Sequence, residues 1–187
     1  SVNNSFIGAS LGQDSIEKGS KSMSISLIIV LLFMLIYYSI RNIGSRVAGL
    51  IACLALLFNL GLICAVLADL GATLTFPGIA GLLLIIGMSV DANVIIFERI
   101  REELRKGKTP RTAIDSGYAR ALTTIIDANV TTLVAALVLY QFGTGPIKGF
   151  ATVLFWGIMI SMFTAIFVTR TIFNSFTERR GLNKLSI

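Results

Sequence analysis

Five long apolar segments, separated by short polar ones, dominate the pattern of residues along the chain. They lie at about residues 23–40, 47–68, 74–97, 122–142 and 147–173. Each has roughly the 17 to 25 residues that a helix needs to cross a bilayer, or slightly more, which a tilted helix accommodates. The pattern predicts an all-α membrane protein with five transmembrane helices, a bundle that covers residues 23–175.

The link between the third and fourth segments, residues 98–120, is hydrophilic and holds seven basic and four acidic residues. Pro110 suits the first position of a helix, where a missing backbone N–H costs least, and Thr109 before it is a plausible N-cap. We therefore expect a structured loop that contains an interfacial helix running from Pro110 into the fourth span.

The distribution of Lys and Arg predicts the orientation. Arg41 and Arg46 follow the first segment, seven basic residues lie in the 98–120 link, and more follow the fifth segment, whereas residues 69–73 and 143–146 contain none. Because basic loops stay in the cytoplasm, the 98–120 link and the tail at residues 176–187 should be cytoplasmic, and residues 1–22 should lie on the far side. An outside amino end without an initiator Met suggests a carboxy-terminal fragment whose upstream part crossed the membrane.

Composition supports the membrane assignment, with 55% hydrophobic and 14% charged residues. The net charge of +6 does not indicate nucleic-acid binding, because the basic residues gather in short stretches between apolar runs, where they act as topology signals. The chain contains no histidine, the usual metal ligand and near-neutral proton carrier. We expect no metal, no cofactor and no catalytic residue, and any titration falls to carboxylates.

Asp91 is the leading candidate for chemistry because it lies inside the third apolar segment. A charge near the bilayer centre costs roughly 2.5 to 3.5 kcal/mol, so such a residue usually faces a partner or a water-filled path and often carries protons. We expect Asp91 to be buried and to change its protonation. The alternative is a permanently paired aspartate that ties two helices together.

Glu98 and Glu102 share one helical face with Asp91 and would lie at the cytoplasmic mouth of a proton path. The alternative is an ordinary solvated helix end whose alternating charges pair locally. Asp127 is a second acidic residue within a span, and its hydroxyl and amide neighbours either bridge helices or line a wet path. Asn93 is a candidate hydrogen-bond partner of Asp91 or Asp127, or else a helix-packing residue.

Residues 87–103 (GMSVDANVIIFERIREE) resemble the fourth transmembrane segment of the SecD branch of the SecD/SecF family of bacterial protein-export membrane proteins. The resemblance extends over essentially the whole chain, and four shorter stretches carry it further. These stretches are residues 10–16 (SLGQDSI), 127–129 (DAN), 143–149 (GTGPIKG) and 184–187 (KLSI). The SecF branch has Asn-Asp where this chain has Asp91-Ala92-Asn93, so the SecD branch is favoured.

The resemblance implies a member of the resistance-nodulation-division superfamily, with this chain supplying five helices of a six-helix half-bundle. It also implies a location in the bacterial inner membrane and late-stage protein export driven by the proton-motive force, with Asp91, Asp127 and Asn93 in proton coupling. The partners that it implies are SecF, the SecYEG translocon, YajC, YidC and the translocating preprotein.

Two other classes of function share the aspartates. A proton-coupled efflux transporter half would share the fold and the buried carboxylates, and fold alone does not separate the two. An intramembrane aspartyl protease also uses two aspartates in neighbouring spans. That family requires Gly-x-Gly-Asp, and Val90 stands here at the second glycine, while Ile126 stands where a tyrosine should precede Asp127. The stretch from Glu98 to Glu103 and the stretches at both ends of the chain, which resemble the SecD branch, favour the protein-export interpretation over both.

Overall fold

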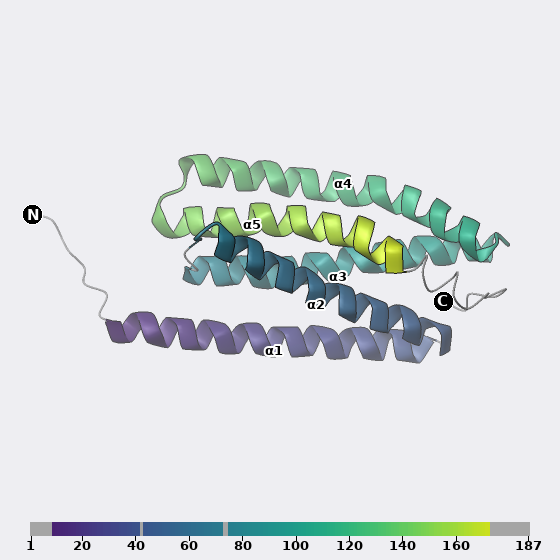
Figure 1. Ribbon diagram of the computed structural model, residues 1–187, viewed down its shortest axis with the longest axis horizontal. Coiled ribbons are helices and arrows are strands. Elements are labelled where there is room, and N and C mark those ends of the chain that lie inside the picture. Colours follow the sequence, from purple (N-terminus) through teal and green to yellow (C-terminus); the bar gives the residue numbers. More distant parts are fainter. Residues whose placement is uncertain (1–8, 42, 73–74, 173–187) are drawn as a thin grey trace, which may run out of the picture.

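The computed structural model describes residues 9–41, 43–72 and 75–172, and they form five long helices whose axes run back and forth along one direction (Figure 1). The described helices are α1 (Ala9–Arg41), α2 (Ile43–Asp69), α3 (Phe76–Arg105), α4 (Pro110–Phe142) and α5 (Gly145–Phe163), followed by the π-helical turn η1 (Thr164–Val168). All five helices are long and apolar enough to cross a membrane. The predicted closing segment at residues 184–187 lies outside the described residues.

Helix α3 is the centre of the bundle and packs against all four other helices. Figure 1 shows α1 and α4 at opposite edges, with α2, α3 and α5 between them. The edge helices keep large apolar side chains on their outer faces, such as Ile29 at 60% and Val134 at 55% exposure. Exposed apolar faces of this extent suit helices that face lipid, because lipid tails are as apolar as the side chains themselves. Many apolar side chains of this bundle therefore stay on its outer surface.

Helices α1, α3 and α4 extend by eight residues or more beyond the apolar segments that the sequence outlines. Helix α3 continues eight residues past Phe97, and α4 begins at Pro110, so the expected 98–120 link is helical except for a turn at residues 106–109. Ion pairs between residues three apart support the polar end of α3. Gly107, with φ at 82°, makes the turn, and Thr109 takes the N-cap position of α4. Helix α1 likewise begins at Ala9, well before residue 23.

Small residues let α3 approach its neighbours closely. Gly157 on α5 lies against the side chain of Ile85, where any β-carbon would overlap it. Gly117 on α4 lies against the backbone of Ile100, and a β-carbon there would be 2.8 Å from both its Cα and N atoms. Side-chain rotation cannot relieve a contact with backbone atoms.

We expect Gly117→Ala to lower the melting temperature of the full-length protein, because overpacking of this kind costs about 1–3 kcal/mol. Gly61→Ala is the matched control, since nothing lies within 4 Å of its added β-carbon and alanine favours a helix over glycine by about 1 kcal/mol. The measurement is the apparent melting temperature of both variants in detergent. Equal stability of Gly117→Ala and wild type would contradict the close approach of α3 and α4.

Candidate functional site

Asp91 lies on an exposed stripe along one side of α3. The stripe repeats every three or four residues, as one face of a helix does, and continues toward the polar end through the partly buried Ile95, Glu98 and Glu102. Its exposed members are Phe76, Ala80, Leu84, Gly87 and Asp91. Because the stripe is apolar except at Asp91, the carboxylate is the one charged group of its exposed part.

The expected burial of Asp91 is not provided by these five helices. Helices α1, α2, α4 and α5 pack around the other sides of α3 and leave this face uncovered. Within the described part of the chain, no hydrogen bond or ion pair links the Asp91 side chain to another residue. The reading in which Asp91 ties two helices of this bundle together therefore has no contact in its favour.

A buried polar cluster lies on the opposite side of α3. The amide nitrogen of Asn59 on α2 donates to the hydroxyls of Ser89 at 2.6 Å and of Ser161 on α5 at 2.9 Å, and the two hydroxyls are 2.6 Å apart. All three side chains are buried. Hydrogen bonds of this kind join helices inside a membrane, so the cluster fixes α2, α3 and α5 relative to one another.

Asn93 lies on this same buried side of α3, away from the exposed Asp91. Its amide nitrogen donates to the carbonyl oxygen of Ser89, and its Oδ1 accepts a hydrogen bond of 3.2 Å from the hydroxyl of Thr169. Thr169 follows the π-helical turn and also donates to the carbonyl of Thr164. Single π-helical turns occur frequently at functional sites. Asn93 thus contacts the residue that follows η1, and the described residues show no bond from it to Asp91 or Asp127.

Asp127 is exposed on α4, and its polar neighbours bond mainly to their own helix. Asn129 donates to the carbonyl of Ile125 at 2.7 Å, and Thr131 donates to the carbonyl of Asp127 at 3.4 Å. These contacts do not bridge α4 to another helix of the bundle. The polar side chains that the sequence singles out near Asp127 are therefore oriented along the outer part of α4.

The two glutamates expected at the mouth pair with arginines of α3 itself. Glu98 accepts from Arg101 at 2.6 Å, and Glu102 binds Arg99 through both of its carboxylate oxygens, at 2.9 and 3.2 Å. Both glutamates are partly buried and lie on the same side of α3 as Asp91. The structure therefore shows the local charge pairing that the sequence offers as the alternative for Glu98 and Glu102. Both pairs lie on the same face of α3 as Asp91.

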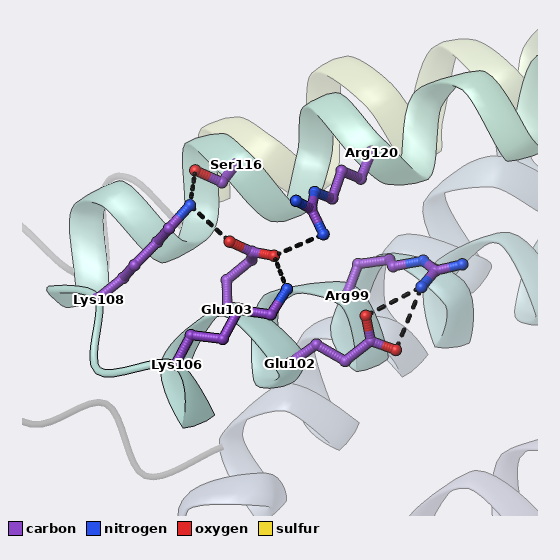
Figure 2. Close-up of polar contacts among 7 residues, drawn as sticks. All are labelled: Arg99, Glu102, Glu103, Lys106, Lys108, Ser116 and Arg120. Atoms are coloured by element: carbon purple, nitrogen blue, oxygen red, sulfur yellow. Dashed lines mark hydrogen bonds and ion pairs between the residues drawn. The ribbon is translucent and has the colours of Figure 1, made fainter.

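Glu103, which the sequence reading passes over, is the centre of the charged network between α3 and α4 (Figure 2). Its side chain has no exposed surface, and its carboxylate contacts Lys106 at 2.7 Å, Lys108 at 2.5 Å and Arg120 at 3.1 Å. Lys108 also donates to the hydroxyl of Ser116 on α4 at 3.0 Å. The signal available in the sequence was the i, i+3 spacing of Glu103 and Lys106. The burial arises only when α4 folds back on α3.

Arg170 closes the same end of the bundle from the last helical segment. It donates to Asp115 on α4 at 2.9 Å and lies 5.9 Å from the centre of the Tyr118 ring. The structure thus pairs this arginine with the neighbouring helix α4. The Arg170–Asp115 pair and the Glu103 network together join three helical segments at this end.

An all-helical bundle of five long apolar helices, with one aspartate on the uncovered face of its central helix, defines a multi-pass membrane protein. A family model described as "Protein export membrane protein SecD/SecF, C-terminal" matches residues 1–179. The chain belongs to the SecD/SecF family. The resemblance drawn from residues 87–103 is confirmed.

Named relatives agree with this family. The chain is 56% identical over 186 residues to the protein translocase subunit SecD of Desulfurispirillum indicum, covering 100% of this chain and 35% of the relative. It is 57% identical over 181 residues to the corresponding protein of Syntrophobacter fumaroxidans, covering 97% of this chain and 33% of the relative. The chain thus spans about a third of the length of the curated relatives that it matches.

A solved structure confirms the predicted fold class. The crystal structure of SecDF from Thermus thermophilus, described as a translocon-associated membrane protein, matches with a TM-score of 0.86 and 43% sequence identity. The match covers 94% of this chain and 24% of that chain. The five-helix bundle therefore has the fold of the matching part of that SecDF structure.

Proposed function

We propose that the full-length protein is a subunit of the bacterial protein-export machinery that uses the proton-motive force to promote late-stage export across the inner membrane. It would act as a transport protein and not as an enzyme. The observation that carries the proposal is Asp91, an aspartate on the uncovered face of the central, most enclosed helix. Membership of a family of protein-export membrane proteins supports the export role.

In this proposal Asp91 carries protons because of what covers its face in the assembled protein. A second half-bundle, supplied by SecF, would pack on the stripe from Phe76 to Asp91 and remove the carboxylate from contact with lipid and bulk water. Burial penalises the charged form of a carboxyl group, so protonation and deprotonation would change how tightly the two halves pack. That change would be transmitted to the parts of the protein that act on the emerging chain.

The other candidate residues take supporting roles in the proposal. Glu98 and Glu102, on the same side of α3 as Asp91, would receive protons at the cytoplasmic mouth through their ion-paired carboxylates. Asp127 would line the outer part of the same route on α4. Asn93 would act from the buried side, because its bond to Thr169 ties the helix that bears Asp91 to the π-helical turn after α5.

The proposed partners are SecF, the SecYEG translocon, YajC, YidC and the translocating preprotein. A solved relative described as translocon-associated supports the contact with the translocon. The proposed location is the bacterial inner membrane. The turn at residues 106–109 would face the cytoplasm, and the turns after α2 and α4 would face the periplasm.

The function is tested by reconstituting the full-length protein with SecF and SecYEG in vesicles and measuring preprotein export at a fixed ATP concentration. An applied proton gradient should accelerate late export and should produce a proton flux that depends on this protein. A proton-permeable ionophore is the control and should remove both effects. Export that proceeds equally fast with and without the gradient would contradict the proposal.

The proposed orientation predicts which cysteines react from which side. With Cys53 and Cys64 replaced by alanine, Thr112→Cys near the start of α4 should react with impermeant thiol reagents only from the cytoplasmic side. Thr144→Cys, in the turn before α5, should react only from the other side. Both positions are exposed, so accessibility does not bias the comparison. The reverse labelling would overturn the orientation and the direction of proton entry.

A further inference from the structure

A cavity of about 590 Å³ opens at the end of the bundle opposite the Glu103 network. It lies between the turn after α2, the last part of α4 and the first three turns of α5. Its volume falls within the roughly 300–1,000 Å³ typical of ligand sites. It is lined by Leu70, Gly71, Ala72, Leu137, Tyr140, Gly145, Lys148, Gly149, Thr152, Phe155 and Trp156.

The cavity is an elongated groove along one face of α5. Lys148, Thr152 and Trp156 are spaced by four residues and so lie one above another, with Leu137 and Tyr140 of α4 on the other wall. From Gly145 to Trp156 the helix rises about 16 Å at 1.5 Å per residue. This length is about half of the ~30 Å hydrocarbon core of a bilayer. In a bilayer that the five helices span, a groove of this length would run from the level of the headgroups to the middle of the membrane.

The mouth of the groove carries a fixed positive charge. The Nζ atom of Lys148 lies 4.6 Å from the centre of the Tyr140 ring, a cation–π contact that holds the ammonium group over the opening. Lys148 is the one charged residue among those that line the groove. The wall below it is apolar and aromatic, and the hydroxyl of Thr152 is already used by the carbonyl of Lys148 at 2.9 Å.

We propose that this groove binds one phospholipid molecule from the adjacent leaflet, with an acyl chain along α5 and the phosphate at Lys148. The depth of the groove matches one acyl chain of one leaflet, and the single cation at its mouth matches one phosphate. A polypeptide helix would need an acidic residue at this depth to pair with the ammonium group, whereas every phospholipid carries its phosphate there. None of the residues that line the groove belongs to the Asp91 stripe. The lipid-binding proposal can therefore be tested independently of proton coupling.

The test uses the full-length protein co-purified with SecF from vesicles of phosphatidylethanolamine and phosphatidylglycerol, with retained phospholipid counted by native mass spectrometry. Thr152→Trp fills the groove and should remove one retained phospholipid per complex. Ala135→Trp is the matched control, because it adds the same side chain at an exposed position of α4 that is outside the groove. Both positions lie seven residues from the end of their helix, and the control should retain lipid as wild type does.

The charge at the mouth is tested separately. Lys148→Gln should reduce retention of the same phospholipid several-fold, and Lys148→Arg should preserve it, because Lys148 is exposed and its replacement leaves the packing intact. Unchanged retention in both Thr152→Trp and Lys148→Gln would overturn the proposal. A photo-crosslinking residue at position 152 should form adducts with phospholipid, and adducts with polypeptide there would show instead that a protein segment covers the groove.

Discussion

Asp91→Asn is expected to abolish the acceleration of export by a proton gradient while leaving the amount of protein in the membrane near that of wild type. Asparagine keeps the size and hydrogen-bonding capacity of the side chain but cannot be ionised. The described helices make no hydrogen bond to the Asp91 carboxylate, so its replacement removes no packing contact within this bundle. A loss of export in this variant would therefore reflect the missing ionisable group and not a failure to fold.

The measurement is gradient-dependent export in vesicles that contain SecF and the translocon, with the protein level determined in the same samples. Asp127→Asn is the comparison variant, because it makes the same change at an exposed aspartate on the edge helix α4. It should slow export without abolishing it if Asp127 lines the route. A loss of SecF co-purification instead would assign Asp127 to helix contacts. Wild-type acceleration in Asp91→Asn would exclude Asp91 as the proton carrier.

The apolar pattern was sufficient to predict the five helices, because each has to satisfy the length requirement of a bilayer by itself. Helix ends were harder to predict, since the polar ends of α3 and α4 are stabilised by contacts between the two helices and not by hydrophobicity. Residues 98–105 read as a hydrophilic link in the sequence, yet they continue α3 through local ion pairs and pack on α4 around Gly117.

The sequence singles out the candidate residues of the site, but it does not predict their surroundings. The sequence places Asp91 inside a span, but which side of α3 the neighbouring helices cover depends on tertiary packing. Asn93 illustrates the same point, because it is two residues from Asp91 and lies on the opposite side of the helix, bonded to Thr169. Asn59 was visible as a lone amide in the second apolar segment. Its partners Ser89 and Ser161 come from distant segments that no local pattern connects.

The second large effect is expected at Glu103, where glutamine should strongly reduce the yield of folded protein. The carboxylate has no exposed surface and balances Lys106, Lys108 and Arg120, so its neutralisation leaves three cations close together without an anion. The three cations are 36–57% exposed, so the loss comes from repulsion between like charges at short range and from a buried amide that cannot replace three ion pairs. The turn at residues 106–109 should then open and become sensitive to protease.

Glu102→Gln is the control for this change, because Glu102 is the adjacent residue and its pair with Arg99 is 45% and 40% exposed. Exposed pairs contribute little to stability, so this variant should behave as wild type. Protein yield and the rate of cleavage at the turn are measured for both variants in the full-length protein. Adding Lys106→Gln to Glu103→Gln removes one of the three unbalanced cations and should recover part of the yield. Equal behaviour of Glu103→Gln and Glu102→Gln would show that the charge of Glu103 does not hold α3 and α4 together.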